Sequence, residues 1–499
     1  MSPRILLLAP LLALSQAAGA QTQATDAPIT AADLRPHIDI LASDEFEGRQ
    51  PATPGESLTT GYLVRELAAR GVEPAGEGGG WLQAVAIAER GVGRHETQWV
   101  SNGRRIGVPD EALVLTGRDP RARIGNAPVI FAGHGAVMPE RGIDQLAGAD
   151  FRGAVALVMY EGPAVEGFPS FEQRIRTLAE AGAVAVIGVT PPDLPFAQVR
   201  RAATRGAVAL DRGPLPAAYG ALSWDGAMAL FEGAGRDLTA MLDEQPGSSF
   251  RSVALPVRAS IDVMTEIRRF TTNNVVGRIR GSDSGGESVL LLGHWDHIGI
   301  CRPEGTPDRI CNGAVDNASG MATLIEAAGR LAAGQRPQRD ILILATTAEE
   351  IGLLGAEHFA RNPVVPANSI VAAVNVDTAA IHPAGMPVAM IGGSEGMRAV
   401  VARVATGLGR RLDGDQEADL LVERQDGWAL VRNNIPAMMA GGSFSDMRLL
   451  AAFLNGAYHG PDDEATPSLE LGGAAEDANL LVALARAFAD RNGYSPAAR

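Results

Sequence analysis

The second half of the chain alternates between short apolar runs and longer amphipathic segments. The apolar runs predict strands at 288–293, 340–346, 370–376, 388–392 and 435–440. The segments between and after them predict helices at 318–333, 352–361, 397–409 and 474–491. Continuous apolar strands between amphipathic helices are typical of a sheet with both faces covered. This half therefore predicts an α/β fold built on a mostly parallel, doubly covered mixed sheet.

The first half has a different pattern. Residues 30–72 predict two helices, the first capped by Thr30, and strands are expected at 81–89 and 96–102. From about 115 to 255, short apolar runs such as 127–133 and 153–160 are separated by turns. One helix is predicted there, at 170–181, before a buried strand at 183–190. We expect a smaller β-rich domain inserted into the chain.

The first twenty residues are typical of a secretory signal peptide. Arg4 supplies the charged start, residues 5–14 are mainly apolar, and Ala18-Gly19-Ala20 is a small-residue cleavage site before Gln21. No later run reaches the roughly 18 apolar residues that a membrane span needs. The sequence therefore predicts an exported protein, periplasmic or secreted, that is not bound to a membrane once residues 1–20 are removed.

Composition narrows the classes of function. The 46% of hydrophobic and 20% of charged residues indicate a folded globular protein. The formal net charge of −15 argues against nucleic acid or anionic lipid as a partner. All 43 basic residues are arginine, which excludes Schiff-base catalysis, pyridoxal phosphate attachment and a P-loop lysine. The composition leaves the oligomeric state open.

The two cysteines, Cys301 and Cys311, flank a polar loop rich in Pro, Gly and Asp. In an oxidising compartment such a pair favours a local disulfide. A metal site is the alternative, and it would need two further ligands nearby.

Side chains that bind metals follow several of the predicted strands, where open α/β sheets place their chemistry. Zinc takes histidine nitrogen and carboxylate oxygen, and a two-metal hydrolase uses roughly five protein ligands with one carboxylate shared. The segments supply two histidines, three ligand carboxylates, one carboxylate for proton transfer and one to orient a ligand. They are His294, Asp296, Asp316, Glu349, Glu350, Asp377 and His459. The sequence therefore predicts a site for two Zn²⁺ ions.

Each of these residues also has an ordinary structural explanation. Asp316 could be a loop aspartate beside a helix N-terminus, and Glu349-Glu350 could be an exposed acidic pair. Asp377 and His459 could be solvated. Their coincidence on matching strand ends favours the metal site. A bound cation would also let one glutamate ligate while its neighbour acts as general base.

Three neighbouring residues could orient the ligands. Asp296 lies two positions after His294 on an extended segment, and His297 adjoins it. Asp462 or Asp463 could receive the other ring N–H of His459.

A serine hydrolase is a rival interpretation. Residues 392–396 fit the G-x-S-x-G motif between a predicted strand and helix, with Ser394 as nucleophile and Asp426 and His459 as partners. It leaves Asp316, Glu349, Glu350 and Asp377 as uncompensated acids. A non-catalytic binding protein on the same scaffold is a third interpretation, although every expected catalytic role is filled.

The motifs resemble the co-catalytic di-zinc aminopeptidase family, zinc exopeptidases related to glutamate carboxypeptidase and transferrin-receptor-like proteins. The matching segments are 294–299 (His-Trp-Asp-His-Ile-Gly), 312–320 (Asn-Gly-Ala-Val-Asp-Asn-Ala-Ser-Gly), 348–355, 375–377 and 458–461. Residues 42–49 and 53–55 also resemble the family's N-terminal portion, which packs onto the catalytic domain. Residues 129–135 and 153–158 resemble a protease-associated domain.

The resemblance implies a role for each residue. Asp316 would bridge the ions, while His294 with Asp377, and Glu350 with His459, would complete the two sites. Glu349 would act as general base and Asp296 would hold His294. Residues 424–426 (Arg-Gln-Asp) occupy the place of a family Arg-Ser-Asp segment and would border the substrate pocket. A single-zinc relative of the glutaminyl cyclase type lacks this full ligand set.

The expected organisation is a signal peptide at 1–20, the N-terminal part of the peptidase domain at 21–115, a protease-associated insert at 116–255 and the catalytic domain at 256–499. The expected activity is that of an exported aminopeptidase acting on peptides, with dipeptidase or carboxypeptidase action as the alternative.

Overall fold

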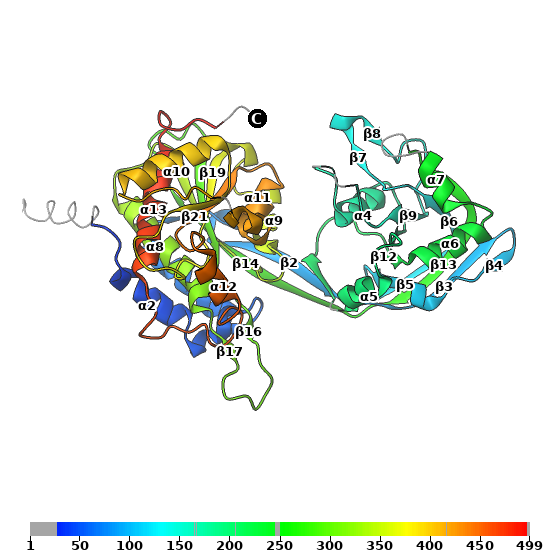
Figure 1. The fold of residues 1–499 in the computed structure, drawn as a ribbon, viewed down its shortest axis with the longest axis horizontal. Helices are drawn as coiled ribbons and strands as arrows, with labels where there is room; N and C mark the ends of the chain where they lie inside the picture. Colours follow the sequence, from blue (N-terminus) through cyan, green and yellow to red (C-terminus); the bar gives the residue numbers. More distant parts are fainter. Residues whose placement is uncertain are drawn as a thin grey trace, which may run out of the picture. The chain divides into compact units, whose positions relative to one another are not determined.

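The computed structural model describes residues 27–496 except 164, 166, 205, 245–249 and 416. The predicted signal peptide at 1–20 lies outside these residues. The described chain forms two compact units, one within Met1–Val85 and Thr271–Arg499 and the other within Ala86–Phe270. The chain enters and leaves the second unit in β2 (Leu82–Arg90) and β14 (Ile267–Ile279) (Figure 1).

The first unit is built on a mixed sheet. Its strands run in the order β14, β18 (Asp340–Thr346), β15 (Ser288–His294), β19 (Ile370–Asn375), β21 (Ala437–Gly441) and β20 (Ala389–Gly392). The four central strands are parallel, and β14 and β20 are antiparallel to their neighbours. β15 and β19 are buried at every position, which explains their unbroken apolar sequences. The predicted α/β class is confirmed.

Helices cover both faces of this sheet. Val289 and Leu291 of β15 pack into one core with α2 (Ala31–Leu41), α3 (Pro54–Ala69), α8 (Gly320–Ala333), α10 (Glu395–Gly407) and α13 (Gly472–Ala489). Leu290 and Leu292 point to the opposite face and pack with residues of α9 (Leu354–Arg361) and α11 (Asp426–Val431) (Figure 1). Successive side chains of one strand thus pack into two hydrophobic cores, one on each face of the sheet.

The segment before the second unit is tied to the strand ends. The 3₁₀ segment at Asp44–Arg49 places the buried Arg49 side chain where it donates to the backbone carbonyls of Trp295, Asn312 and Gly313. This agrees with the packing that the resemblance implied for residues 42–49. Nearby, the predicted disulfide joins Cys301 to Cys311.

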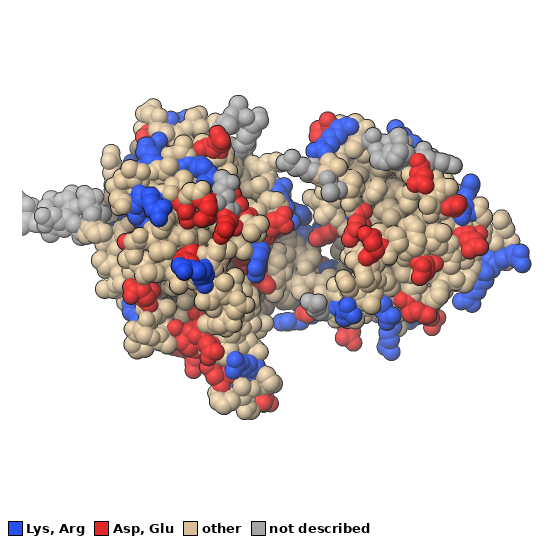
Figure 2. All heavy atoms as spheres, viewed as in Figure 1, with Lys and Arg blue, Asp and Glu red and all other residues tan. Residues whose placement is uncertain are grey.

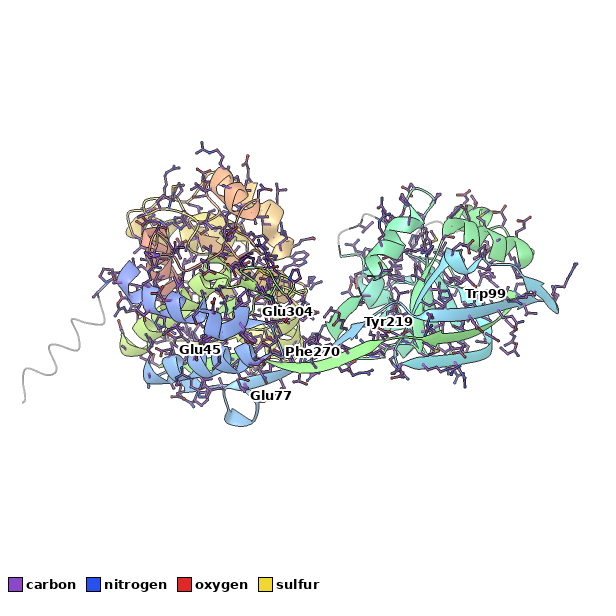
Figure 3. All side chains as sticks on the ribbon, turned by 90° about the horizontal axis from the view of Figure 1, so that it is seen from below. Glu45, Glu77, Trp99, Tyr219, Phe270 and Glu304 are labelled. Carbon is purple, nitrogen blue, oxygen red and sulfur yellow. A yellow bond between two sulfur atoms is a disulfide. The ribbon has the colours of Figure 1, made fainter. Side chains whose placement is uncertain are left out.

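The second unit has a sheet of its own, in the order β4 (Arg104–Ile106), β3 (Arg94–Ser101), β13 (Val253–Met264), β6 (Arg121–Phe131), β9 (Val155–Met159), β10 (Ala185–Val189), β12 (Ala218–Leu222) and β5 (Leu113–Gly117). β6, β9, β10 and β12 are parallel. Trp99 of β3 is fully buried in its core (Figure 3).

Helices are more frequent in this unit than the sequence pattern predicted. α4 (Phe171–Glu180) was expected, but α5 (Phe196–Thr204), α6 (Trp224–Gly233) and α7 (Leu238–Glu244) were not. All three have ten residues or fewer, and short helical patterns are hard to recognise between apolar runs. The compact unit also extends beyond the predicted limits of 116–255, because β3 pairs with β13 and β4 pairs with β3 in its sheet. Its assignment as a protease-associated domain stays a prediction.

On the face shown in Figure 2, acidic and arginine side chains are interspersed over each unit. Among the described residues, no helix combines the length and apolar character that a membrane span requires.

Candidate metal centre

The predicted metal-binding residues converge at the carboxyl ends of the parallel strands of the first unit. His294 is the last residue of β15, Glu349 and Glu350 follow β18, and Asp377 follows β19. Asp316 precedes α8, and His459 comes from the loop before α13. Parallel strands bring these distant segments to one edge because their carboxyl ends coincide.

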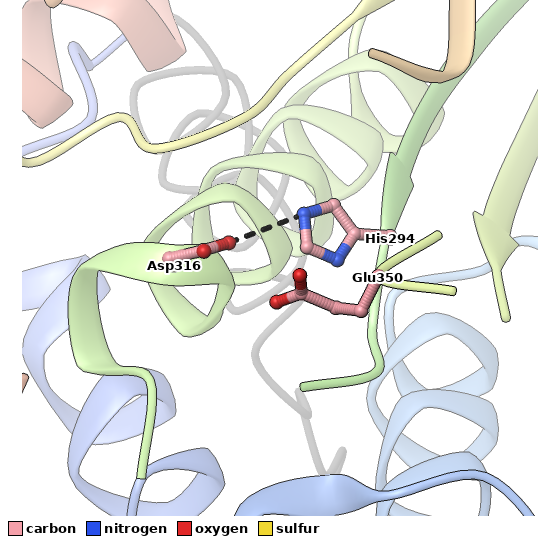
Figure 4. A group of neighbouring side chains, drawn as sticks. All are labelled: His294, Asp316 and Glu350. Atoms are coloured by element: carbon pink, nitrogen blue, oxygen red, sulfur yellow. Dashed lines mark ion pairs between the residues drawn. The ribbon is translucent and has the colours of Figure 1, made fainter. Parts of the chain in front are cut away.

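Asp316 lies at the middle of the group, and its two oxygens face different histidines. Oδ1 is 3.3 Å from Nε2 of His294, and Oδ2 is 3.3 Å from Nε2 of His459. Figure 4 shows the first of these contacts, with Glu350 beside it. A carboxylate with one oxygen toward each of two ligand sets is the arrangement that a bridging ligand needs.

Each side of Asp316 carries one further carboxylate. Asp377 Oδ1 lies 3.4 Å from Nε2 of His294, and Glu350 Oε2 lies 2.8 Å from Nε2 of His459. His294 thus lies beside Asp377 and His459 beside Glu350. One ligand atom each of His294, Asp316 and Glu350 lie within 4.8 Å of one another, as do those of His294, Glu349 and Asp377.

His297 holds Glu350 in place. Its Nδ1 lies 2.7 Å from Glu350 Oε1, which leaves Oε2 facing His459. From sequence, only the adjacency of His297 to Asp296 drew attention to this residue.

Asp296 acts differently from the prediction. The Nδ1 of His294 is 3.1 Å from the backbone oxygen of Asp296, whereas the nearest carboxylate oxygen is 3.9 Å away. That carboxylate instead accepts a hydrogen bond of 3.1 Å from the backbone N–H of Glu349. Asp296 therefore positions His294 through its main chain and the Glu349 segment through its side chain.

Asp463 also departs from its predicted role. It was expected, with Asp462, as an acceptor for the His459 ring, but it accepts the backbone N–H groups of Val315 and Asp316 at 2.8 and 3.0 Å. The prediction failed because nearness in sequence to His459 did not reveal which segment folds over Asp463. Asp463 fixes the backbone of the candidate bridging residue.

Asn317 joins three segments of the site, a role that the sequence analysis missed. Its Nδ2 donates to the backbone oxygens of His294 and Val376, and its Oδ1 accepts from the N–H of Thr378. A buried amide next to a candidate ligand was the available signal, because such a group must find partners.

Burial sets the electrostatics of the site. Burial and the neighbouring Asp426, Asp377 and Glu350 raise the pKa of Glu349 well above its ordinary range. Burial opposes protonation of His459, but Asp316 and Glu350 outweigh it and raise its pKa to about 9. Without a cation, retained protons on Glu349 and His459 therefore reduce the negative charge of the cluster.

The residues fit the binding of divalent metal. Asp377 Oδ1 and His459 Nε2 are buried and, within the described part of the chain, have no hydrogen-bond partner despite their close neighbours. A cation would satisfy such atoms and displace the retained protons. Imidazole nitrogen with carboxylate oxygen is a donor set that zinc prefers.

A pocket opens beside these residues. His294, Asp316, Glu349 and Asp377 border one side. Apolar side chains make up much of the remaining lining, together with Arg424 and Gln425 of the predicted segment 424–426. Asp426 is not among the residues that line this pocket. The apolar residues are Leu421, Met439, Phe444, Leu450, Phe453, Leu454 and Tyr458.

The structure does not support Ser394 as the nucleophile of a serine hydrolase. The Ser394 hydroxyl caps α10 by accepting from the N–H of Met397. Asp426 is hydrogen-bonded by Thr346, and His459 contacts Asp316 and Glu350. Across the described residues, no hydrogen bond joins Ser394 to Asp426 or His459.

Comparisons with known proteins agree with the motifs. Residues 274–483 match the family described as Peptidase family M28. The probable glutamate carboxypeptidase AMP1 of Arabidopsis thaliana is 34% identical over 119 residues, which is 23% of this chain and 15% of the relative. A probable zinc metalloprotease of Leptosphaeria maculans is 32% identical over 131 residues, or 26% of this chain and 30% of the relative. The chain thus spans less than a third of either relative's length.

Among solved structures, an aminopeptidase from Aneurinibacillus sp. strain AM-1 is similar with a TM-score of 0.46 and 17% identity, covering 93% of this chain and 95% of that one. A peptidase M28 precursor from Shewanella amazonensis SB2B is similar with a TM-score of 0.44 and 18% identity, covering 95% and 96%.

The fold and the residue set of the first unit define a zinc-peptidase type of domain. The resemblance drawn from the motifs is confirmed, because residues 274–483 match the model of peptidase family M28.

Proposed function

We propose that this protein is a di-zinc exopeptidase that removes N-terminal residues from peptides. The observation that carries the proposal is the position of Asp316, with one oxygen toward His294 and Asp377 and the other toward His459 and Glu350. Four donor side chains grouped around one carboxylate match the needs of two zinc ions.

Zinc bound there would supply Lewis acidity toward the scissile carbonyl and the attacking water. Glu349 would accept the proton of that water and pass it to the leaving amine. Zinc bound beside Glu349 would lower the pKa that burial raises in the metal-free site, so the carboxylate would be ionised and able to accept the proton. The hydrogen bond from the Glu349 N–H to Asp296 fixes the segment that carries this base.

The apolar pocket favours a substrate with an apolar side chain next to the scissile bond. Leu450, Phe453 and Leu454 of α12 (Met447–Leu454) supply much of its wall. Burial of such a side chain contributes roughly 1.5–3 kcal/mol of binding.

Carboxypeptidase action is the second candidate. Arg424 borders the same pocket, and a guanidinium is suited to hold the terminal carboxylate of a peptide.

Substrates with a blocked amino or carboxyl terminus distinguish aminopeptidase from carboxypeptidase action. An aminopeptidase should cleave leucyl-anilide and lose this activity on the acetylated analogue. Cleavage of N-blocked dipeptides with a free carboxylate, and no turnover of free-amine anilides, would support carboxypeptidase action instead.

The Glu349→Gln variant tests the general base. We expect kcat to fall by about 10²–10⁴-fold, while zinc content stays at two ions per chain. Glu304→Gln is the matched control, since Glu304 is exposed on the loop between the cysteines (Figure 3). Unchanged turnover in Glu349→Gln, or a purified active protein without zinc, would contradict the proposal.

The exported location rests on residues 1–20. N-terminal sequencing of the mature protein should begin at Gln21, and the protein should be recovered from the periplasm or the medium. A chain that retains Met1 in the cytoplasm would contradict export.

A further inference from the structure

The second unit contains a cavity of about 330 Å³. It is bordered by α4, α5, β5, β11 (Ala207–Leu210) and β12, all of which belong to this unit. Most of its wall is apolar, with Val114, Ile175, Val199, Ala203 and Phe171 among the lining residues. Its size and lining are those of pockets that enclose a small organic molecule.

Two arginines give the cavity its charge. Arg90 pairs with Asp211 at 2.5 Å, and Arg176 pairs with Glu172 at 2.8 Å. In each pair the arginine is the more buried partner. The side chain of Arg90 is 2% exposed and that of Asp211 is 26% exposed. The side chain of Arg176 is 13% exposed and that of Glu172 is 60% exposed. Asp211 also pairs with Arg269 at 2.9 Å, so its charge is shared between two guanidinium groups. Glu172 also lines the cavity, so its charged lining consists of two arginines and one acid.

Both arginines keep unused hydrogen-bond donors. The Nε atoms of Arg90 and Arg176 are buried and have no partner within the described chain. Across the same residues, the hydrogen bond of Arg90 to Asp211 through Nη2 is its one side-chain bond. A guanidinium has five N–H donors, and a buried donor without an acceptor is costly.

Two phenols add to this set. Tyr160 and Tyr219 line the cavity, and in the described structure neither hydroxyl has a hydrogen-bond partner (Tyr219 is labelled in Figure 3). The Tyr160 ring lies against Phe171, with ring centroids 4.6 Å apart. An acceptor near the arginines with an apolar body along the aromatic wall would satisfy both parts of the cavity.

We propose that the second unit binds a small organic carboxylate with an apolar or aromatic body in this cavity, separately from the metal centre. A carboxylate is a planar acceptor that arginine N–H groups hold well. The apolar walls exclude an ion without a hydrophobic part, such as inorganic phosphate, as the preferred ligand. This inference does not depend on the proposed peptidase activity.

Photolabelling of the full zinc-loaded chain tests the location. The probe is 4-benzoylbenzoate, an aromatic carboxylate, and the neutral control is its primary amide. We expect saturable labelling in peptides from 160–176 or 199–221, and weaker labelling by the amide by about tenfold or more, the effect of losing a charge-assisted hydrogen bond. Labelling confined to 421–458, beside the metal centre, would overturn the proposal.

Variants test the residues. Ala203→Phe should fill the cavity, and Arg176→Gln should remove a donor that Arg90 does not replace. Both should weaken binding of the probe in calorimetry by about tenfold or more, whereas Arg258→Gln, an exposed arginine of β13 outside the lining, should not. Unchanged affinity in both test variants, equal affinity for acid and amide, or no saturable binding would each overturn the assignment.

Discussion

Each unit of this protein contains a buried arginine that holds loops together, and the two differ in what surrounds them. Arg49 in the first unit donates to the backbone oxygens of Leu41, Trp295, Asn312 and Gly313. Arg174 in the second unit donates to those of Pro169, His134, Met159 and Tyr160. Burial lowers the pKa of each to about 10.

The neighbouring charges distinguish the two arginines. Asp316, Asp463, Asp296 and Glu350 act electrostatically on Arg49 and oppose the effect of burial on its pKa. For Arg174, burial is the principal cause of its shift. Its carbonyl partners include Met159, the last residue of a parallel strand, and Tyr160 after it. In both units a buried arginine thus donates to several backbone carbonyls. In the first unit these carbonyls lie beside a cluster of acids, and in the second they include the end of a strand.

Removal of the proposed bridging carboxylate should give the largest effect. We expect Asp316→Ala to lose zinc and to lower kcat/KM by about 10³-fold or more, since the metal contributes several kcal/mol of charge stabilisation. Metal analysis and steady-state kinetics measure this. Asp262→Ala in the second unit, where Asp262 forms surface pairs with Arg121 and Arg123, is the control and should retain both properties. Full zinc content in Asp316→Ala would contradict its bridging role.

Replacing each buried arginine tests the comparison directly. Arg49→Met and Arg174→Met should each lower the free energy of unfolding by roughly 3 kcal/mol or more, because several buried carbonyls lose a charged donor. Only Arg49→Met should also weaken zinc binding, because its carbonyl partners adjoin the ligands. Denaturant titration and zinc affinity of the folded variants separate the effects. Equal zinc affinity in the two variants would show that Arg49 does not support the centre.

A smaller effect is expected from Asp296→Asn. The amide preserves the backbone contact with His294 but weakens the acceptor for the Glu349 N–H. Loss of such a supporting contact typically costs 10–100-fold in metal affinity or activity, so about tenfold is expected here. Asp283→Asn is the control, since the Asp283 side chain is largely exposed. Indifference of both zinc affinity and kcat to Asp296→Asn would remove this residue from the site.

The weakest effect concerns pH. Burial raises the pKa of Asp296 to about 7 and those of Asp426 and Asp463 to about 6. Carboxyls with a raised folded-state pKa stabilise the zinc-free fold below their unfolded pKa of about 4, and this stability is lost as pH rises through 6 to 7. The difference in Tm between zinc-loaded and zinc-free protein should therefore widen from pH 5 to pH 8.

The second unit should not lose stability in this way between pH 5 and pH 8. Hydrogen bonds from Arg121 lower the pKa of Asp262, so the stability that this group contributes is present above pH 4 and lost as pH falls further. Hydrogen exchange on peptides of each unit, without zinc, separates the two responses. A zinc-free first unit that becomes more protected between pH 5 and pH 8 would contradict the pKa shifts.

Local sequence was sufficient for the elements that carry the metal centre. The runs ending at His294, Thr346 and Asn375 are apolar without interruption, and the structure places strands there within a residue of the predicted ends. Buried parallel strands need such runs, and their carboxyl ends must meet at one edge, so the convergence of His294, Glu349 and Asp377 was predictable.

Contacts between distant segments were not determined locally. Arg49 lies 263 positions from Asn312, and Asp463 lies 147 positions from Asp316, yet both pairs hydrogen-bond. A polar residue in a loop can turn toward solvent or toward any nearby segment, and the choice depends on which backbone groups burial leaves without partners. The sequence by itself determined which side chains could bind metal and at which strand ends they lie. The tertiary structure decided how Asp296, Asn317 and Asp463 orient them, because buried donors and acceptors can be matched only after the segments have packed.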